Sequence, residues 1–189
     1  EDVCGFAGTI KEESARLISL IDDIIKLSRL DESTVPHETE IIDVCGSVHD
    51  VVSRLSGKAS ENNVELSFEG EPSEIKGVQH ILDEIVYNIC ENAIKYNRPG
   101  GFVKVSVRNE SDESLITVAD NGIGIPKADR ERVFERFYRV DKSHSKQIGG
   151  TGLGLSIVKH GVIFLGGRIN LESEEGVGTV ITVGFPRAR

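Results

Sequence analysis

Polar side chains recur at helical spacing in the segment that ends at Asn97. Asn92, Lys95 and Tyr96 follow Asn88 by four, seven and eight positions, so a helix would place all four on one face. Amide oxygens suit Mg²⁺, which combines few protein oxygens with phosphate oxygens and water. A lysine beside them could bind phosphate, and a tyrosine could pack against a flat ring. A solvated polar helix face explains the spacing equally well.

A carboxylate follows the strand-like segment 115–119. Alternation along that segment places Asp120 on the same face as Ile116 and Val118. If that face is covered, the carboxylate needs hydrogen-bond donors, and the exocyclic amine of adenine is a suitable one. Gly122 and Gly124 would let a ligand approach the backbone closely. The alternative interpretation is an ordinary Asp-Asn-Gly turn.

Two later segments have the chemistry of anion binding. Residues 127–146 carry seven basic and four acidic side chains, a net +3 against −12 for the remaining chain, and could cover a triphosphate. A solvated amphipathic loop is the alternative there. Residues 149–155 read GGTGLGL and open a helix, where exposed backbone amides attract anions. Their glycine spacing fits neither the P-loop nor the dinucleotide fingerprint, and close packing accounts for only one or two of these glycines.

The elements that must position these segments follow from hydrophobic periodicity. Apolar residues recur every three, four and seven positions over the first thirty residues, which predicts one amphipathic helix that packs against another helix. Strands are expected at 40–44, 64–68, 102–107, 115–119, 168–172 and 179–185, and further helices up to about 62, over 78–96, just after the glycine-rich turn at 122–124, and up to about 164. This order predicts an α+β sandwich whose mixed, mostly antiparallel sheet is covered on one face by helices.

Composition excludes several classes of protein. The chain has 189 residues, of which 38% are hydrophobic and 28% charged, as expected of a globular protein. A net charge of −9 argues against general binding of nucleic acids or anionic membranes. Three widely separated cysteines exclude a pairwise disulfide framework and favour a reducing compartment.

Taken together, these segments resemble the ATP-binding catalytic domain of two-component sensor histidine kinases, in the GHKL superfamily. The matching motifs are the N box NICENAIKYN (88–97), the first glycine box DNGIGIP (120–126), the F box VFERFYRVD (133–141) and the second glycine box GGTGLGLSIVKH (149–160). The resemblance covers about residues 38–186. It implies a Bergerat-type α/β sandwich that binds ATP and Mg²⁺ between the N-box helix and a mobile lid at about 127–150.

The resemblance also implies roles for single residues. Asn92 would bind Mg²⁺, Asn88 would contact the metal–phosphate region, Lys95 would hold phosphate, and Arg139 would approach the γ-phosphate. Asn88, Lys95 and Arg139 are therefore the expected catalytic residues. Adenine contacts are expected from Tyr96, Asp120, Gly122, Gly124 and Ile125. The lid would be anchored by Phe137 and Tyr138, and the phosphate-side wall would comprise Gly150, Thr151, Gly152, Leu153, Gly154 and Leu155.

The resemblance divides the chain into two parts. Residues 1–33 resemble the second helix of the dimerisation and phosphoacceptor hairpin, and residues 34–189 resemble the catalytic domain. In the family the phosphoacceptor histidine lies on the preceding helix, and none of the five histidines here has its sequence context. We therefore expect a fragment that binds Mg-ATP and does not phosphorylate itself.

The expected function is that of a protein-histidine kinase, which transfers the γ-phosphoryl group of ATP to a histidine for relay to an aspartate. The expected partners are ATP, the histidine-bearing helix, a response-regulator receiver domain, and a second copy in the full-length kinase, without nucleic acid. The location is expected to be cytoplasmic, either free or as part of a membrane-anchored sensor. One alternative is a GHKL-type ATP hydrolase, in which a water-activating glutamate is expected at the position of Asn88. The other is a nucleotide-responsive docking module that pairs through its first helix.

Overall fold

The computed structural model describes residues 2–31, 38–140 and 150–188. The helices and strands are, in chain order, α1 (Asp2–Asp31), β1 (Glu40–Asp43), α2 (Val44–Glu61), β2 (Val64–Gly70), β3 (Glu74–Gly77), α3 (Gln79–Lys95), β4 (Gly101–Glu110), β5 (Glu113–Asp120), η1 (Lys127–Asp129), η2 (Arg132–Phe134), α5 (Gly154–Phe164), β6 (Arg168–Glu174) and β7 (Gly178–Pro186).

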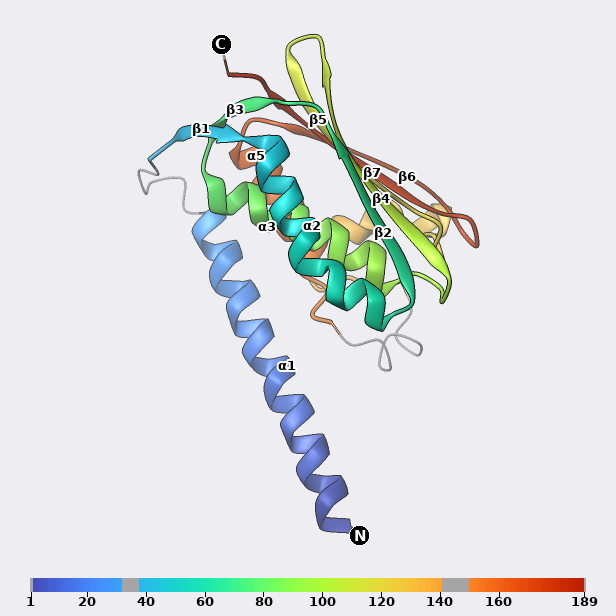
Figure 1. Cartoon of the computed structure of the whole chain (residues 1–189). Helices are drawn as coiled ribbons and strands as arrows, with labels where there is room; N and C mark the ends of the chain where they lie inside the picture. Colours follow the sequence, from blue (N-terminus) through green and yellow to red (C-terminus); the bar gives the residue numbers. More distant parts are fainter. Residues whose placement is uncertain (1, 32–37, 141–149, 189) are drawn as a thin grey trace.

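Five strands form the central sheet in the order β2-β4-β5-β7-β6. Only the β2–β4 pair is parallel, and the other three pairs are antiparallel. Helices α2, α3 and α5 lie along one face of this sheet (Figure 1). The predicted fold class, a mostly antiparallel sheet covered on one face by helices, is confirmed.

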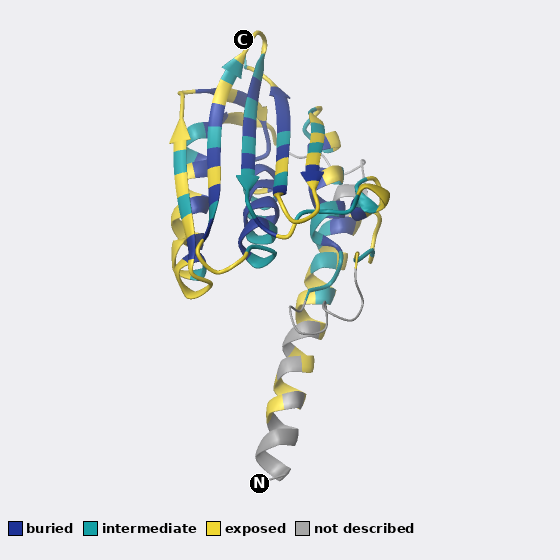
Figure 2. Cartoon of the chain, turned by 90° about the vertical axis from the view of Figure 1, so that its right-hand side faces the viewer, coloured by how far each residue is buried: buried dark blue, intermediate teal, exposed yellow. Residues whose placement is uncertain are grey.

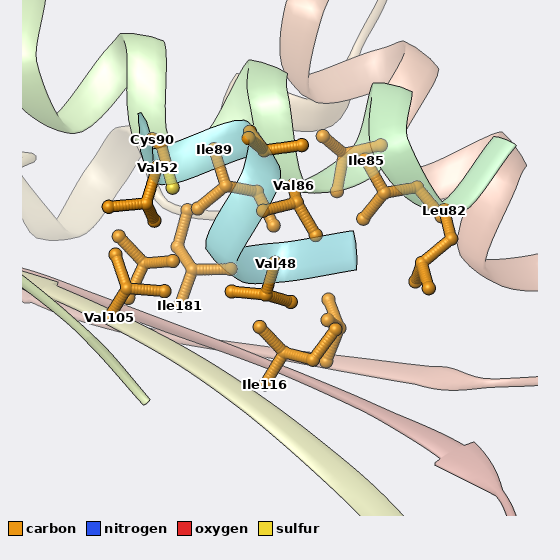
Figure 3. Close-up of a cluster of buried hydrophobic side chains, with 14 of the residues drawn as sticks. Val48, Val52, Leu82, Ile85, Val86, Ile89, Cys90, Val105, Ile116 and Ile181 are labelled. Atoms are coloured by element: carbon orange, nitrogen blue, oxygen red, sulfur yellow. The ribbon is translucent and has the colours of Figure 1, made fainter. Parts of the chain in front are cut away.

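The core lies between the sheet and the three covering helices. Side chains from α2, α3 and the strands meet there, among them Val48, Ile85, Ile89, Ile116 and Ile181 (Figure 3). The strands alternate between buried and more exposed residues along their length (Figure 2), as expected when one face of a sheet is covered. This layer fixes the position of α3, the helix that carries the predicted N box.

Strand β3 (Glu74–Gly77) was not predicted. It pairs with β1 in a separate two-stranded antiparallel sheet. Only Ile75 supplies a large apolar side chain to the core from this four-residue strand, so its sequence has too little alternation to reveal it. The short helix expected after the glycine-rich turn is observed as two 3₁₀ turns, η1 and η2.

Helix α1 projects away from the sandwich and packs against it through its C-terminal part (Figure 1). Leu27 is buried with Leu153 and Ile157, and Leu20 packs beside them. Six large apolar side chains along the helix are 45% or more exposed: Ile10, Leu17, Ile18, Ile21, Ile24 and Ile25. Among the described residues, no helix combines the length and the apolar character needed to cross a bilayer.

Candidate nucleotide-binding site

A cavity of about 750 Å³ opens beside α3, between the end of β5, the loop after η2 and the start of α5. It is lined by all the predicted site residues except Gly122 and Leu153, namely Asn88, Asn92, Lys95, Tyr96, Asp120, Gly124, Ile125, Tyr138, Arg139, Gly150, Thr151, Gly152, Gly154 and Leu155. The tertiary structure therefore brings together segments that are up to 67 positions apart, from Asn88 to Leu155.

The carboxylate of Asp120 lies at one end of the cavity. Its Oδ1 accepts hydrogen bonds from the backbone N–H groups of Gly122, at 2.8 Å, and Thr179, at 3.3 Å. Because both backbone donors bind Oδ1, the lone pairs of Oδ2 remain to accept from a ligand. Burial raises the pKa of Asp120, and the two backbone hydrogen bonds oppose that shift. Apolar side chains line the cavity around it, including Val118 and Ile181.

Gly122 and Gly124 allow close packing of the protein backbone. Gly122 does not line the cavity, and its contact with a ligand stays a prediction. A Cβ atom at Gly122 would lie 2.4 Å from the carbonyl oxygen of Tyr96. At Gly124, where φ is +68°, a Cβ would lie 1.9 Å from the carbonyl oxygen of Glu174. Only glycine allows these approaches, so the loop is held against α3 on one side and the β6–β7 hairpin on the other.

Asn88 presents its amide oxygen to the opposite end of the cavity. Its Nδ2 donates to the carbonyl oxygen of Glu84 at 2.8 Å, one helical turn earlier. The Oδ1 atom consequently faces Gly154, where an added Cβ would lie 3.0 Å from it, and Asn92 lies beside the same glycine. The two asparagines thus project from one face of α3 toward the N-terminus of α5, as the spacing predicts.

Cationic groups lie next to these amides. Burial lowers the pKa of Lys95, and the neighbouring Arg139 contributes to that shift. A Cβ added at Gly150 would lie 2.5 Å from Lys95 Nζ, so the ammonium group contacts the glycine loop. Arg139 Nη1 donates to the carbonyl oxygen of Gly150 at 2.8 Å. Two positive side chains therefore meet the same loop at this end of the cavity.

Both the ring and the hydroxyl group of Tyr138 contact other side chains. The hydroxyl donates to Asp129 Oδ1, and the guanidinium of Arg132 lies 4.1 Å from the ring centroid. Phe137 is attached differently from the prediction, because the residue is 58% exposed and its backbone N–H donates to the carbonyl oxygen of Gly152 at 3.0 Å. Residues 141–149, which include the rest of the predicted lid, lie outside the described part of the chain.

Leu153 does not line the cavity, contrary to the prediction. Its side chain is fully buried against Leu27 and Ile157, and so it joins α1 to α5. Its backbone N–H donates to Thr151 Oγ1 at 3.2 Å, which shapes the loop locally. From Gly150 to Leu155, every residue except Leu153 lines the cavity, and the side chain of Leu153 lies in the core instead.

Several residues at the cavity were not predicted as part of the site. Helix α1 contributes Glu13, Ser19, Asp23 and Lys26, and α3 contributes Glu84 and Glu91. The side chains of Asp23 and Thr151 are hydrogen bonded although they are 128 positions apart. Periodicity within α1 distinguishes its polar face from its apolar stripe, but no local pattern indicates which polar residues would meet the glycine loop.

Comparison with known proteins identifies the family. A sequence model of the family described as histidine kinase-, DNA gyrase B-, and HSP90-like ATPase matches residues 77–189. The chain belongs to this family. The matched segment contains the N box, both glycine boxes and the F box, which together surround the cavity.

Relatives of this ATPase-family chain are named as sensor kinases. Sensor-like histidine kinase SenX3 of Mycolicibacterium smegmatis is 38% identical over 182 residues, which cover 96% of this chain and 47% of that protein. Sensor histidine kinase WalK of Bacillus subtilis is 38% identical over 185 residues, which cover 96% of this chain and 30% of that protein. The chain therefore spans about half, or less, of the length of these relatives.

Solved structures agree with this assignment. The structure of full-length ShkA in complex with AMPPNP superposes on all of this chain and 39% of its own, with a TM-score of 0.83 and 25% identity. Mycobacterial sensor histidine kinase MprB matches 79% of this chain and 98% of its own, with a TM-score of 0.70 and 29% identity. Within the ATPase family, the chain therefore contains the ATP-binding catalytic domain of a two-component histidine kinase, and the resemblance inferred from its four motifs is confirmed.

Proposed function

We propose that this chain is the catalytic part of a protein-histidine kinase and that its cavity binds Mg-ATP. The observation that carries the proposal is that the two ends of the cavity differ in chemistry. Asp120 offers a carboxylate oxygen among apolar side chains at one end, which suits an adenine amine. Asn88, Asn92, Lys95 and Arg139 lie together at the other end, which suits a metal-bound triphosphate.

The residues at the second end are suitable for magnesium. Within the described ranges, no three His, Cys, Asp or Glu side chains group into a metal site. The amide oxygens of Asn88 and Asn92, together with phosphate oxygens of the nucleotide, would supply the ligands. When bound, the ion would neutralise charge on the phosphates and align the γ-phosphoryl group for transfer.

The chain's own residues would then hold and screen the nucleotide. Lys95 and Arg139 would offset charge on the terminal phosphates, and the backbone amides around Gly152 and Gly154 would add donors at the start of α5. Tyr96 would pack against the base. An imidazole nitrogen of the histidine-bearing helix would attack the γ-phosphorus while the bond to the β-phosphate oxygen breaks and ADP leaves. The phosphoryl group would pass on to an aspartate of a receiver domain.

Helix α1 supports the further proposal that residues 1–33 belong to a dimerisation hairpin and residues 34–189 to the catalytic domain. Six of its large apolar side chains between Ile10 and Ile25 are 45–66% exposed, which suits pairing with other helices in a bundle. The partners proposed here are the histidine-bearing helix and a second copy of the chain in the full-length kinase.

Two features of α3 favour a kinase over a hydrolase. A hydrolase needs a general base that can take a proton from water, and the amide of Asn88 cannot do so. The carboxylate of Glu84, one helical turn before Asn88, is already bound to Lys26 Nζ at 2.6 Å. The well-formed cavity argues against a purely structural role.

Titration with Mg-ATP in a calorimeter tests the nucleotide site. The native chain is expected to bind saturably, and Asn92→Ala is expected to weaken the Mg²⁺-dependent part of binding. Asp120→Asn keeps an Oδ1 acceptor for Gly122 and Thr179, but it turns an amide donor toward the adenine amine. An unpaired buried donor costs about 1–3 kcal/mol, or roughly five- to 150-fold in affinity. Asp50→Asn, at an exposed position of α2, is the matched control.

A second experiment tests transfer. The chain is incubated with γ-labelled ATP and a separately made hairpin that bears the phosphoacceptor histidine. Acid-labile phosphate on the hairpin, and none on the chain itself, is the expected result. Rapid ATP turnover without the hairpin would favour the hydrolase, and no nucleotide binding at all would favour the docking module.

A further inference from the structure

The C-terminal part of α1 contacts two elements of the nucleotide site at once. Lys26 Nζ donates to Glu84 Oε1 of α3 at 2.6 Å, and Asp23 Oδ2 accepts from Thr151 Oγ1 of the glycine loop at 2.7 Å. Asp23 and Lys26 are three positions apart, so they share a face of α1. Both line the cavity. Leu27, buried against α5, holds this turn of the helix in place between the two polar contacts.

Lys26 is connected to Asn88 through Glu84, which contacts both residues. The Nδ2 atom of Asn88 donates to the carbonyl oxygen of Glu84 at 2.8 Å and lies 3.4 Å from Glu84 Oε1. With both interactions on Nδ2, the amide oxygen is the atom that faces the cavity. The position of the Glu84 carboxylate therefore helps to decide which end of the Asn88 amide meets a ligand, and Lys26 fixes that carboxylate.

The contact made by Asp23 leads to the phosphate-side loop. Thr151 Oγ1 donates to Asp23 and accepts from the N–H of Leu153, so the threonine rotamer is fixed from both sides. The flanking Gly150 has φ +115° and receives the Arg139 guanidinium on its carbonyl oxygen. Since glycine restrains the backbone little, a side-chain contact beside it contributes strongly to the order of this loop.

Charge adds to these contacts. The side chains of Lys26 and Glu84 are 43% and 26% exposed, so the pair is partly shielded from water. Burial opposes the charged form of Lys26, but the hydrogen bond and negative charge of Glu84 raise its pKa overall. Removal of Lys26 would leave the Glu84 carboxylate without its cation beside Asn88, where an anionic ligand has to bind.

We propose that Lys26 and Asp23 are positioning residues of the nucleotide site: Lys26 holds Glu84 and thereby orients Asn88, and Asp23 holds Thr151. The inference rests on the proposed function, because it takes Mg-ATP as the occupant of the cavity. The docked α1 helix is then a part of the metal–phosphate end of the site. Displacement of α1 from α5 loosens Asn88 and the glycine loop together.

The test is the affinity of the full chain for Mg-ATP and the Mg²⁺ concentration that gives half-maximal ATP binding. Lys26→Ala is expected to weaken binding about three- to tenfold, in the lower part of the range of coupling within a hydrogen-bonded network, and to raise the Mg²⁺ requirement. Lys26→Arg is expected to restore both, because a guanidinium can also pair with Glu84. Lys11→Ala removes the same charge from an exposed position of α1 and is expected to change neither quantity.

Asp23 is tested with variants that separate charge from hydrogen bonding. Asp23→Asn keeps an acceptor for Thr151, whereas Asp23→Ala removes it, so the alanine variant is expected to bind Mg-ATP about threefold or more weakly than the asparagine variant. Asp22→Ala, on the exposed side of the same turn, is the control. An alanine variant that binds as tightly as the asparagine variant would show that Asp23 acts through its charge alone, and would overturn its positioning role.

A double-mutant cycle completes the test. In a Glu84→Gln background, Lys26→Ala is expected to lose most of its effect on nucleotide affinity, because the partner charge is gone. An undiminished effect overturns the proposed route through Glu84. Thermal unfolding checks that each variant is folded, and Lys26→Met, which keeps the aliphatic stem, replaces the alanine variant if that one unfolds. A native chain that binds no Mg-ATP overturns the proposed function and this inference with it. A native chain that binds while Lys26→Ala behaves like Lys11→Ala overturns this inference alone.

Discussion

Replacement of Gly124 by alanine tests how the loop after β5 obtains its shape. Gly124 has φ +68°, and a Cβ there would lie 1.9 Å from the carbonyl oxygen of Glu174 and 3.0 Å from the Cα of Glu175. Gly176 offers a matched control in the facing hairpin. Its φ is +79°, and no atom of the described residues lies within 4 Å of its added Cβ. The two glycines thus share a backbone conformation and differ in the space around them.

The expected magnitude follows from this difference. A left-handed backbone conformation costs an alanine about 1–2 kcal/mol at either position. At Gly124 the backbone must also move away from Glu174, which adds about 1–3 kcal/mol, the usual cost of overpacking. The entropy that alanine removes from the unfolded chain is equal for both variants and cancels. Gly124→Ala is therefore expected to lower the free energy of unfolding by about 1–3 kcal/mol more than Gly176→Ala does.

Urea unfolding followed by circular dichroism gives the free energy of unfolding for the native chain and both variants. Calorimetric titration of the same proteins with Mg-ATP shows whether the distorted loop also loses nucleotide affinity, since Ile125 and Asp120 flank it at the cavity. A Gly124→Ala variant no less stable than Gly176→Ala would refute the reasoning, because the loop would then not depend on its close contact with the hairpin.

Three further outcomes are expected. Burial raises the pKa of Asp120 above its ordinary value of 3.8. The protonated carboxyl group therefore stabilises the fold below that pH, and this stabilisation is lost as the pH rises through the folded-state pKa. Relative to the native chain, Asp120→Asn should gain thermal stability toward neutral pH. Leu27→Ala should weaken α1 docking by about 2–4 kcal/mol and speed amide exchange near residue 27, whereas Leu17→Ala, 57% exposed, should not. Burial raises the pKa of Cys90 to about 12, so peptide mapping should find it unmodified by thiol reagents in the folded chain, while the partly exposed Cys45 reacts.

Local periodicity is sufficient for most of the elements. The alternation over 115–119 and the helical spacing over 78–96 predict β5 and α3 within two residues, because each buries a regular face against the other layer. Strand β3 is the exception. It has four residues and one large buried side chain, and it exists because β1 supplies its hydrogen-bond partners.

The sequence by itself also determines the polar face of α3. Asn88, Asn92 and Lys95 share that face by helix geometry alone, and all three line the cavity. Asp120 follows from the period of two along β5 in the same way. These residues are predictable because their relative positions depend on hydrogen bonds between neighbours in the chain.

Only the tertiary structure decides the rest of the site. Gly122 and Gly124 have backbone atoms of other segments against them, and Leu153 turns into the contact between α1 and α5. Asp23 and Lys26 reach the cavity because Leu27 packs on α5, more than a hundred positions away in the sequence. The physical reason is that burial of apolar surface between distant segments has no local period, so the polar residues that it carries into the site leave no pattern of their own in the sequence.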